Sequence, residues 1–280
     1  MTVGPSDTVR NAAEGVTPDS AGWQYLSFKI VHLEAGARLA AHTKAEETAL
    51  IWLAGRATVE GFGTVGGRVD VWDGKPFALL LPPGIPYDLG AESPCDLAIV
   101  SAPAQSELPP RLIRPDDVRV ETRGSGVTER RIHWIVAEQD PAARLILVEV
   151  FTPAGHWSTF PPHKHDTDDP PRERALEELY YYRIRPEQGF AFQGIYTADL
   201  SLDLALRPRH DQLVLVPRGF HVVSAAPGYD CYYLNAMAGA VREWLFTTDP
   251  DHAWLMDWKK VRTTPPREPL PDPPRKGEGE

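Results

Sequence analysis

Prolines and glycines divide this chain into short segments, and their spacing constrains the fold more than any other feature of the sequence. The 280 residues include 28 prolines and 22 glycines, which suit tight turns better than helices. Helical periodicity is not sustained in any window, although Pro171 to Leu176 could open with a short helical turn. The runs expected to form strands are Trp23–Leu33, Ala49–Leu53, Phe77–Leu81, Leu97–Ser101, Arg131–Ala137, Leu145–Phe151, Leu179–Ile184, Phe190–Tyr196, Leu213–Val216 and Tyr232–Met237. Many short strands at regular spacing predict an all-β sandwich or barrel.

The two halves of the chain repeat one pattern. Each half reads as a strand, a glycine turn, a histidine, an acidic pair, an apolar strand and a Pro-x-Gly turn. The matched segments are Phe28–Gly36, His42, Glu46–Glu47 and Leu79–Gly84 in the first half, and Val148–Gly155, His163–His165, Glu177–Glu178 and Val214–Gly219 in the second. A repeat this long predicts two copies of one domain rather than a solenoid. We expect a flexible arm at 1–17, an N-terminal domain at 18–118, a C-terminal domain at 119–262 and a disordered proline-rich tail at 263–280.

Composition narrows the class of partner. The net charge of −10 argues against nucleic acid, which requires clustered lysines and arginines. It allows an anionic small molecule, because a few arginines can dominate inside a pocket. Neither a signal peptide nor an apolar run approaching the ~20 residues of a membrane span is visible. Cys95 and Cys231 lie in apolar runs and are expected to be reduced core thiols, so we expect a cytoplasmic protein.

Histidines and a glutamate in the second half form a candidate metal site. His163 and His165 would share one face of a strand, because side chains alternate with period two. On the next strand Glu178 shares a face with Tyr180 and Tyr182, which could face a polar cavity. The alternative ligand Glu177 shares a face with Leu179, a natural core residue, so Glu178 is favoured as the metal ligand.

The fourth proposed ligand is His221, which follows a Pro-x-Gly turn more than fifty residues further on. Three imidazoles and one carboxylate suit a divalent ion such as zinc, manganese, iron or nickel. The first half has His42, but Lys44 stands where the second half has His165, and Pro86-Tyr87 stands where it has Phe220-His221. We therefore expect the metal site in the C-terminal domain alone.

The metal motif resembles those of the cupin superfamily, and two copies would make a bicupin of jelly-roll-like β-barrels. A closer resemblance is to the 5-deoxy-glucuronate isomerases of bacterial myo-inositol breakdown. The segments that carry it are Thr17–Trp23, Pro162–Asp168, Glu177–Arg183, Gln188–Gln193, Val216–His221 and Tyr232–Gly239, followed by the stretch to Trp254. Two residues depart from the expected pattern, Phe220 in place of Tyr and Tyr182 in place of His, and neither is a proposed ligand.

The resemblance implies an aldose–ketose isomerisation between 5-deoxy-D-glucuronate and 5-dehydro-2-deoxy-D-gluconate. A metal ion would stabilise the charge that develops on the carbonyl oxygen, and a base would move a proton between carbons. A metal-bound hydroxide, Tyr180, Tyr182 and Asp168 are the candidate bases, and a hydride shift stays open. The alternatives are another metal-dependent cupin enzyme, such as a uronate ketol-isomerase or dioxygenase, and a non-enzymatic sugar-acid binder.

The substrate would be an anionic sugar acid, and a carboxylate is best bound by arginine. Arg218 is the preferred candidate; Arg183 is weaker, because alternation places it opposite Glu178. Gln188 and Gln193 could bind sugar hydroxyls, and Lys164 is a further candidate for substrate contact. A homo-oligomer is possible, and the aromatic residues near Trp244 and Trp254 would pack on a barrel or at a subunit interface.

Overall fold

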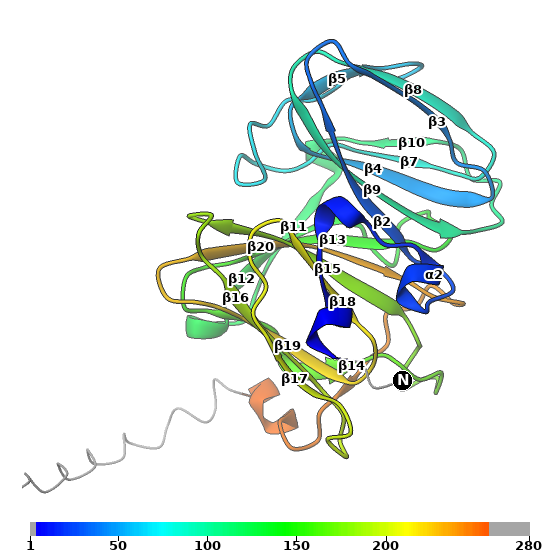
Figure 1. Ribbon diagram of the computed structural model, residues 1–280. Helices are drawn as coiled ribbons and strands as arrows, with labels where there is room; N and C mark the ends of the chain where they lie inside the picture. Colours follow the sequence, from blue (N-terminus) through cyan, green and yellow to red (C-terminus); the bar gives the residue numbers. More distant parts are fainter. Residues whose placement is uncertain (1–3, 258–280) are drawn as a thin grey trace, which may run out of the picture.

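The structure is a computed structural model that describes residues 4–257, and β-strands dominate it (Figure 1). The helical elements are short: α1 (Pro5–Thr8), α2 (Pro18–Ala21), and the 3-10 turns η1 (Ala12–Glu14), η2 (Pro115–Asp117), η3 (Gly126–Thr128) and η4 (Ala253–Asp257). The all-β prediction is confirmed, and every expected run overlaps a strand. Within 4–257, no helix has the length and apolar character needed to cross a membrane. The tail expected at 263–280 lies outside the described residues.

The first half of the chain forms two sheets that enclose an apolar interior. One sheet has the order β10-β7-β4-β9-β2 and the other has the order β3-β8-β5-β6. The strands are β2 (Ser27–Leu33), β3 (Arg38–His42), β4 (Glu46–Ala54), β5 (Arg56–Val59), β6 (Gly63–Gly66), β7 (Ala78–Leu81), β8 (Pro86–Ala91), β9 (Cys95–Pro103) and β10 (Arg111–Ile113). Leu50, Trp52, Val65, Leu79 and Leu97 are among the side chains that fill the space between them.

The second half repeats this arrangement with a larger sheet, β1-β18-β15-β20-β13-β12-β11, and a smaller one, β17-β16-β19-β14-β21. Its strands are β11 (Arg119–Arg123), β12 (Arg130–Val136), β13 (Ile146–Thr152), β14 (Trp157–Lys164), β15 (Glu177–Arg185), β16 (Ala191–Tyr196), β17 (Asp203–Leu206), β18 (Gln212–Val216), β19 (Phe220–Ala225), β20 (Asp230–Ala238) and β21 (Thr247–Thr248). Strand β1 (Val9–Asn11) comes from the start of the chain and pairs with β18. Residues 9–11 therefore belong to a sheet, which corrects the flexible arm expected at 1–17.

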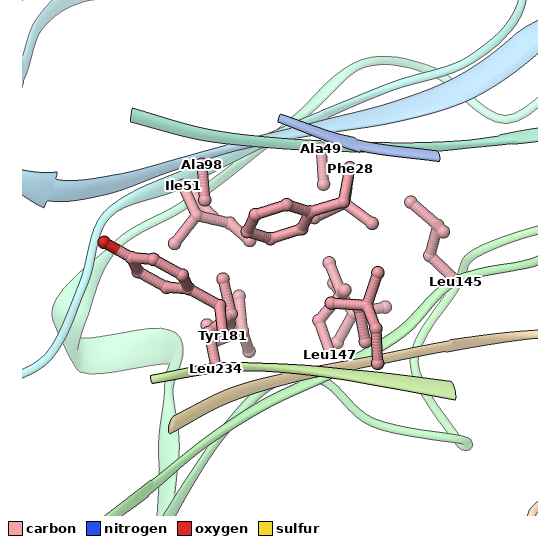
Figure 2. Packing of buried hydrophobic residues seen from close by; sticks show 14 of the residues in the cluster. Phe28, Ala49, Ile51, Ala98, Leu145, Leu147, Tyr181 and Leu234 are labelled. Carbon is pink, nitrogen blue, oxygen red and sulfur yellow. The ribbon is translucent and has the colours of Figure 1, made fainter. Parts of the chain in front are cut away.

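The large sheets of the two halves pack face to face, so their central strands are buried on both sides. On β4, Ala49 and Ile51 belong to the shared core between the sheets, whereas Trp52 points into its own domain. On β15, Tyr181 belongs to the shared core and Tyr180 to the interior of the C-terminal domain. Figure 2 shows this packing, with Phe28, Ala49, Ile51 and Ala98 facing Leu145, Leu147, Tyr181 and Leu234. Alternation along a doubly buried strand thus separates residues of the interface from residues of the barrel interior.

Two glutamates make matching contacts across this interface. The Glu177 carboxylate accepts hydrogen bonds from the backbone N–H groups of residues 24–26 at 2.6–3.0 Å. Glu47 accepts from the N–H groups of residues 143–145 in the opposite domain, at 2.7–2.9 Å. These segments precede β2 and β13, and because their N–H groups bind a carboxylate, β2 begins at Ser27 rather than at the expected Trp23.

Strand registers correct the alignment of the two acidic pairs. Thr48 lies opposite Leu81, directly before the first Pro-x-Gly turn, and Glu178 lies opposite Val216, directly before the second. Thr48 is therefore the counterpart of Glu178, and Glu47 is the counterpart of Glu177. The sequence pattern, which matched Glu46–Glu47 with Glu177–Glu178, is off by one residue. No helix forms over 171–176. The segment begins with a hydrogen-bonded turn in which the Glu173 N–H donates to Asp169 O, and a β-bridge pairs Asp169 with Glu173.

The paired glutamates generate a stability prediction. Replacing Glu47 or Glu177 by Ala leaves three backbone N–H groups without their acceptor, so each change should lower the free energy of unfolding by about 2–3 kcal/mol. Urea unfolding followed by circular dichroism measures the loss. Glu107→Ala, on an exposed side chain, is the control and should stay within about 0.5 kcal/mol of the unchanged protein. A loss at Glu47 no larger than the control would contradict the interface described above.

Candidate metal centre

Three histidines meet at one end of the C-terminal barrel. His163 lies on β14 and His165 directly after it, while His221 lies on β19 opposite His163 in the antiparallel register. One ligand nitrogen from each ring lies within 4.8 Å of the others. The expected strand geometry of His163 and His165 is thus present, and β19 brings in the distant His221. The three rings form a cluster that could hold a metal ion.

Backbone carbonyls orient the three imidazoles in the same way. Nδ1 of His163 lies 3.3 Å from the carbonyl of Pro161, Nδ1 of His165 lies 3.2 Å from Leu176 O, and Nδ1 of His221 lies 3.4 Å from Gly219 O. An N–H at Nδ1 that donates to a carbonyl leaves the Nε2 lone pair free. This orientation is typical of histidines that bind a metal through Nε2.

Glu178 completes the cluster from β15. Its Oε2 lies 3.1 Å from His165 Nε2 and 2.9 Å from His221 Nε2. Its Oε1 accepts a hydrogen bond of 2.7 Å from Asn235 Nδ2. Burial alone would raise the pKa of the Glu178 carboxyl, but His221 and His165 outweigh it and hold that pKa well below its usual range. Glu178 is therefore an ionised carboxylate inside the barrel, on the side predicted for it, while Glu177 faces the other domain.

The contacts between these side chains fit a bound cation. His221 Nε2 is buried and makes no hydrogen bond, although the Glu178 oxygen is close. Two such atoms lie this close when a proton or a metal ion stands between them, and His165 Nε2 is likewise within hydrogen-bond distance of Glu178 Oε2. Neighbouring ligands of an ion with metal–ligand bonds of about 2.1 Å are separated by about 3 Å. The four residues therefore suit a divalent ion, and their assignment as its ligands stays a prediction.

The N-terminal barrel has the same fold but lacks counterparts of the three histidines and Glu178 as a group. Thr48 occupies the position of Glu178, and Pro86, paired with His42, occupies that of His221. The sequence comparison, which matched Pro86-Tyr87 with Phe220-His221, is therefore off by one residue. His42 Nδ1 accepts a hydrogen bond from the Lys44 N–H, so the His42 ring stabilises the local turn. Among residues 4–257 the metal-type cluster occurs in the C-terminal barrel alone.

Two neighbouring cavities lead to the cluster from inside the barrel. The smaller inner cavity, of about 50 Å³, is lined by His163, Glu178 and Tyr180 among others, and the larger inner cavity, of about 310 Å³, also reaches His163. Burial, reinforced by the charge of Glu178, raises the pKa of Tyr180 well above its usual range. The phenol beside the cluster is therefore protonated at physiological pH and can donate a hydrogen bond.

Several residues predicted for the site lie elsewhere on β15 or beyond it. Tyr182 is deeper in the barrel, where its hydroxyl donates to Gln193 Oε1 at 2.8 Å. Arg183 faces the other domain and forms ion pairs with Asp96 and Asp211. Gln188 is exposed in the turn after β15, at the end of the strand remote from Glu178. The geometry does not support substrate contact by Arg183 or Gln188.

Three other candidates lie on the outer side of the cluster. Lys164 points away from the flanking histidines and binds Asp166 and Glu173, which fixes the loop after β14. Asp168 and Arg218 line a separate cavity of about 290 Å³, the outer cavity, which touches His165 and His221 but not Glu178. Arg218 is at the surface, where it donates to Ser201 at 3.3 Å.

Three residues beside the cluster are not among the site residues predicted from the sequence, although one of them, Trp244, packs on the barrel as expected. Asn235 orients Glu178, and Arg130 and Trp244 line both inner cavities. Asn235 stands inside one of the motif segments, so its position was visible. Arg130 could have been found from its alternation with Ile132 and Trp134 on a strand that lines the barrel. Trp244 lies outside the strands, where no pattern indicates orientation.

Comparisons with known proteins found a matching family model and similar chains. A family model described as the KduI/IolB family matches residues 4–255. The 5-deoxy-glucuronate isomerase of Geobacillus kaustophilus (strain HTA426) is 45% identical over 249 residues, which cover 87% of this chain and 90% of the relative. That of Bacillus subtilis (strain 168) is 37% identical over 248 residues, covering 86% of this chain and 92% of the relative.

Solved structures show the same fold. The crystal structure of an IolB-like protein from Salmonella typhimurium LT2 has a TM-score of 0.86 and 38% identity, and the match covers 89% of this chain and 99% of that one. A mutant oxalate decarboxylase of Bacillus subtilis has a TM-score of 0.61 at 13% identity, with 91% and 83% covered. This second likeness concerns the fold alone, and it confirms the predicted tandem of cupin barrels.

The cluster predicts that metal binding requires the histidines of the C-terminal barrel. We expect one divalent ion per chain in the purified protein, and His163→Ala should weaken its binding at least about 100-fold, because it removes a nitrogen ligand. Metal analysis after dialysis and titration with the metal give the measurement. His42→Ala, which changes the counterpart of His163 in the other barrel, is the matched control and should retain the ion. Equal metal content in both variants would show that the ion binds elsewhere.

Proposed function

The chain belongs to the KduI/IolB family, and we propose that it is a 5-deoxy-glucuronate isomerase. It would interconvert 5-deoxy-D-glucuronate and 5-dehydro-2-deoxy-D-gluconate in myo-inositol catabolism. Relatives of this name share up to 46% identity over 87% of the chain. The structural observation that carries the proposal is the ionised Glu178 with three oriented histidines, beside a protonated Tyr180 that lines the same cavity as Glu178.

The reaction moves one hydrogen between two neighbouring carbons. As the hydrogen leaves C2 and one is added at C1, the C1 carbonyl becomes a hydroxyl and the C2 hydroxyl becomes a carbonyl, so no external oxidant is consumed. His163, His165, His221 and Glu178 would hold a divalent ion, which would supply positive charge near these oxygens. Zinc, manganese, iron and nickel are all compatible with such ligands.

The protein's own groups then divide into positioning and proton-donating roles. Asn235 fixes one oxygen of Glu178, which leaves the other directed at the histidines. Tyr180 keeps its proton, so it can donate to a substrate oxygen but is a poor base. Tyr182 already donates to Gln193, and Asp168 faces the outer cavity. Of the side chains considered as bases, Tyr180 is thus the best placed, and its role is that of a donor.

The surroundings of the cluster suit a small polar substrate. The smaller inner cavity carries the hydroxyl groups of Ser158, Thr159 and Tyr233. The Tyr233 hydroxyl shares hydrogen bonds with those of Ser158, at 2.5 Å, and Thr159, at 3.2 Å. Hydroxyls both donate and accept, and they can exchange these bonds for bonds to sugar hydroxyls. His165, Glu178 and His221 are buried, and electrostatic contacts made in such surroundings are stronger than in water.

The proposed activity predicts turnover without oxygen. Metal-loaded protein incubated anaerobically with 5-deoxy-D-glucuronate should give 5-dehydro-2-deoxy-D-gluconate, observed by NMR, because the reaction is internally balanced. The double variant His163→Ala and His221→Ala should lose this turnover and keep its β-type circular dichroism. Absence of product from the metal-loaded protein, or consumption of oxygen with another product, would contradict the proposal.

The two tyrosines of β15 predict different kinetic effects. Tyr180→Phe should lower kcat about 100-fold, because it removes the donor next to the metal cluster. Tyr182→Phe should change kcat less than about 3-fold while costing about 1–2 kcal/mol of stability, since it leaves Gln193 Oε1 without its partner. Steady-state kinetics and thermal unfolding measure the two quantities. Similar kinetic losses in both variants would argue against a specific role for Tyr180.

A further inference from the structure

Arg130 is a buried arginine inside the C-terminal barrel. It lies at the start of β12 and shares a strand face with Ile132 and Trp134, both of which belong to the interior core. Its side chain crosses toward β14, where Nη2 lies 3.4 Å from the carbonyl of Phe160, and Nη1 donates to Thr128 O at 3.0 Å. A guanidinium has five N–H donors, so these two backbone contacts leave others available.

A comparison with Arg68 shows that Arg130 lacks a counter-ion. The two arginines are almost equally buried, at 6% and 7% exposure. Arg68 binds both oxygens of Glu149, at 2.5 and 3.3 Å, and this pairing raises its pKa although burial acts in the opposite direction. Burial lowers the pKa of Arg130, and no carboxylate in residues 4–257 forms an ion pair with it. A buried charge without a partner is costly, which indicates that an anion completes it.

A second unpaired donor lies beside it. The indole Nε1 of Trp244 is buried and has no hydrogen-bond partner among the described residues. The ring packs on Trp134 with centroids 5.3 Å apart, so its orientation is fixed. Trp244 and Arg130 line the same two cavities, and each cavity is also lined by His163. Two donor groups therefore flank the space that leads to the metal cluster.

The other arginines near the barrel are committed elsewhere. Arg123 lines the same cavities, but its Nε donates to Glu121 at 2.8 Å. Arg183 pairs with aspartates on the opposite face of β15. Arg218 lines the outer cavity, from which Glu178 is absent. Arg130 is thus the guanidinium that is both unpaired and in the cavity of the cluster.

We propose that Arg130, assisted by the Trp244 N–H, binds the carboxylate of the sugar-acid substrate and so directs its other end to His163 and Glu178. This inference rests on the proposed function, because it takes the substrate to be a uronate whose reacting carbonyl lies at the opposite end from the carboxylate. It replaces Arg218 and Arg183 as the carboxylate-binding residues. Arg130 is also a specificity determinant, since a neutral sugar leaves the guanidinium unpaired.

The first test compares arginine variants. Arg130→Met should raise KM for 5-deoxy-D-glucuronate about 100-fold, and Arg130→Lys about 10-fold, because a lysine keeps the charge but not the planar set of donors. Arg218→Met is the matched control and should stay within about 2-fold of the unchanged enzyme. Metal content and circular dichroism are measured on each variant. An unchanged KM in Arg130→Met, or a large rise in Arg218→Met alone, would overturn the assignment.

The second test uses a neutral substrate, the 5-deoxy aldose with a hydroxymethyl group in place of the carboxylate. The unchanged enzyme should favour the acid over the neutral sugar about 100-fold in kcat/KM, and Arg130→Met should convert the two with similar kcat/KM. A purely structural role of Arg130 would lower both values without removing the preference. If Arg130→Met does not fold, Arg130→Lys decides, since an unaltered preference for the acid in that variant rejects the proposal. Failure of the unchanged, metal-loaded enzyme to convert the acid rejects the proposed function instead, so the two failures are distinguishable.

Discussion

The alternation of side chains along β15 is the constraint on which the interface and the site both depend. This strand is buried on both faces, so neighbouring residues lie in different environments. Glu177 accepts three backbone N–H groups of the N-terminal domain, and Glu178 reaches the histidines inside the barrel. A slip of one residue would exchange the two carboxylates, leaving an unpaired charge on each side. The interface that holds the two domains together therefore also fixes the orientation of the proposed metal ligand.

The N-terminal domain provides a control within the same chain. It keeps the interface glutamate as Glu47, but Thr48 stands where the barrel-facing carboxylate would be. Its interior is filled by Leu50, Trp52 and other apolar side chains, without a metal-type cluster among the described residues. The scaffold and its interface are thus independent of the ligand set. A large apolar face on this domain packs against β13 and β15 of the C-terminal barrel.

Local periodicity explains which features could be predicted from the sequence. The strands, the convergence of His163 and His165, and the orientation of Glu178 into the barrel follow from period-two alternation, and all three are present in the structure. The offset between the acidic pairs could not be seen, because adjacent glutamates look alike until hydrogen-bond register distinguishes them. Gln188 lies near the motif in sequence but a full strand away in space, at about 3.3 Å per residue. Arg130 precedes the histidine pair by more than thirty residues, and Trp244 follows His221 by more than twenty. Only the folded barrel therefore brings them together.

Charge inside the barrel and charge over the whole molecule act on different scales. The net charge of −10 is spread over a surface where salt screens interactions beyond about 10 Å. Within the cavity, Arg130 acts at short range in a medium less polarisable than water, where an ion pair with a ligand is stronger. The ionised Glu178 adds negative charge to that space, and a divalent ion would reverse its sign. An acidic protein can therefore select an anionic sugar, because the few positive groups that the substrate meets are buried and otherwise unpaired.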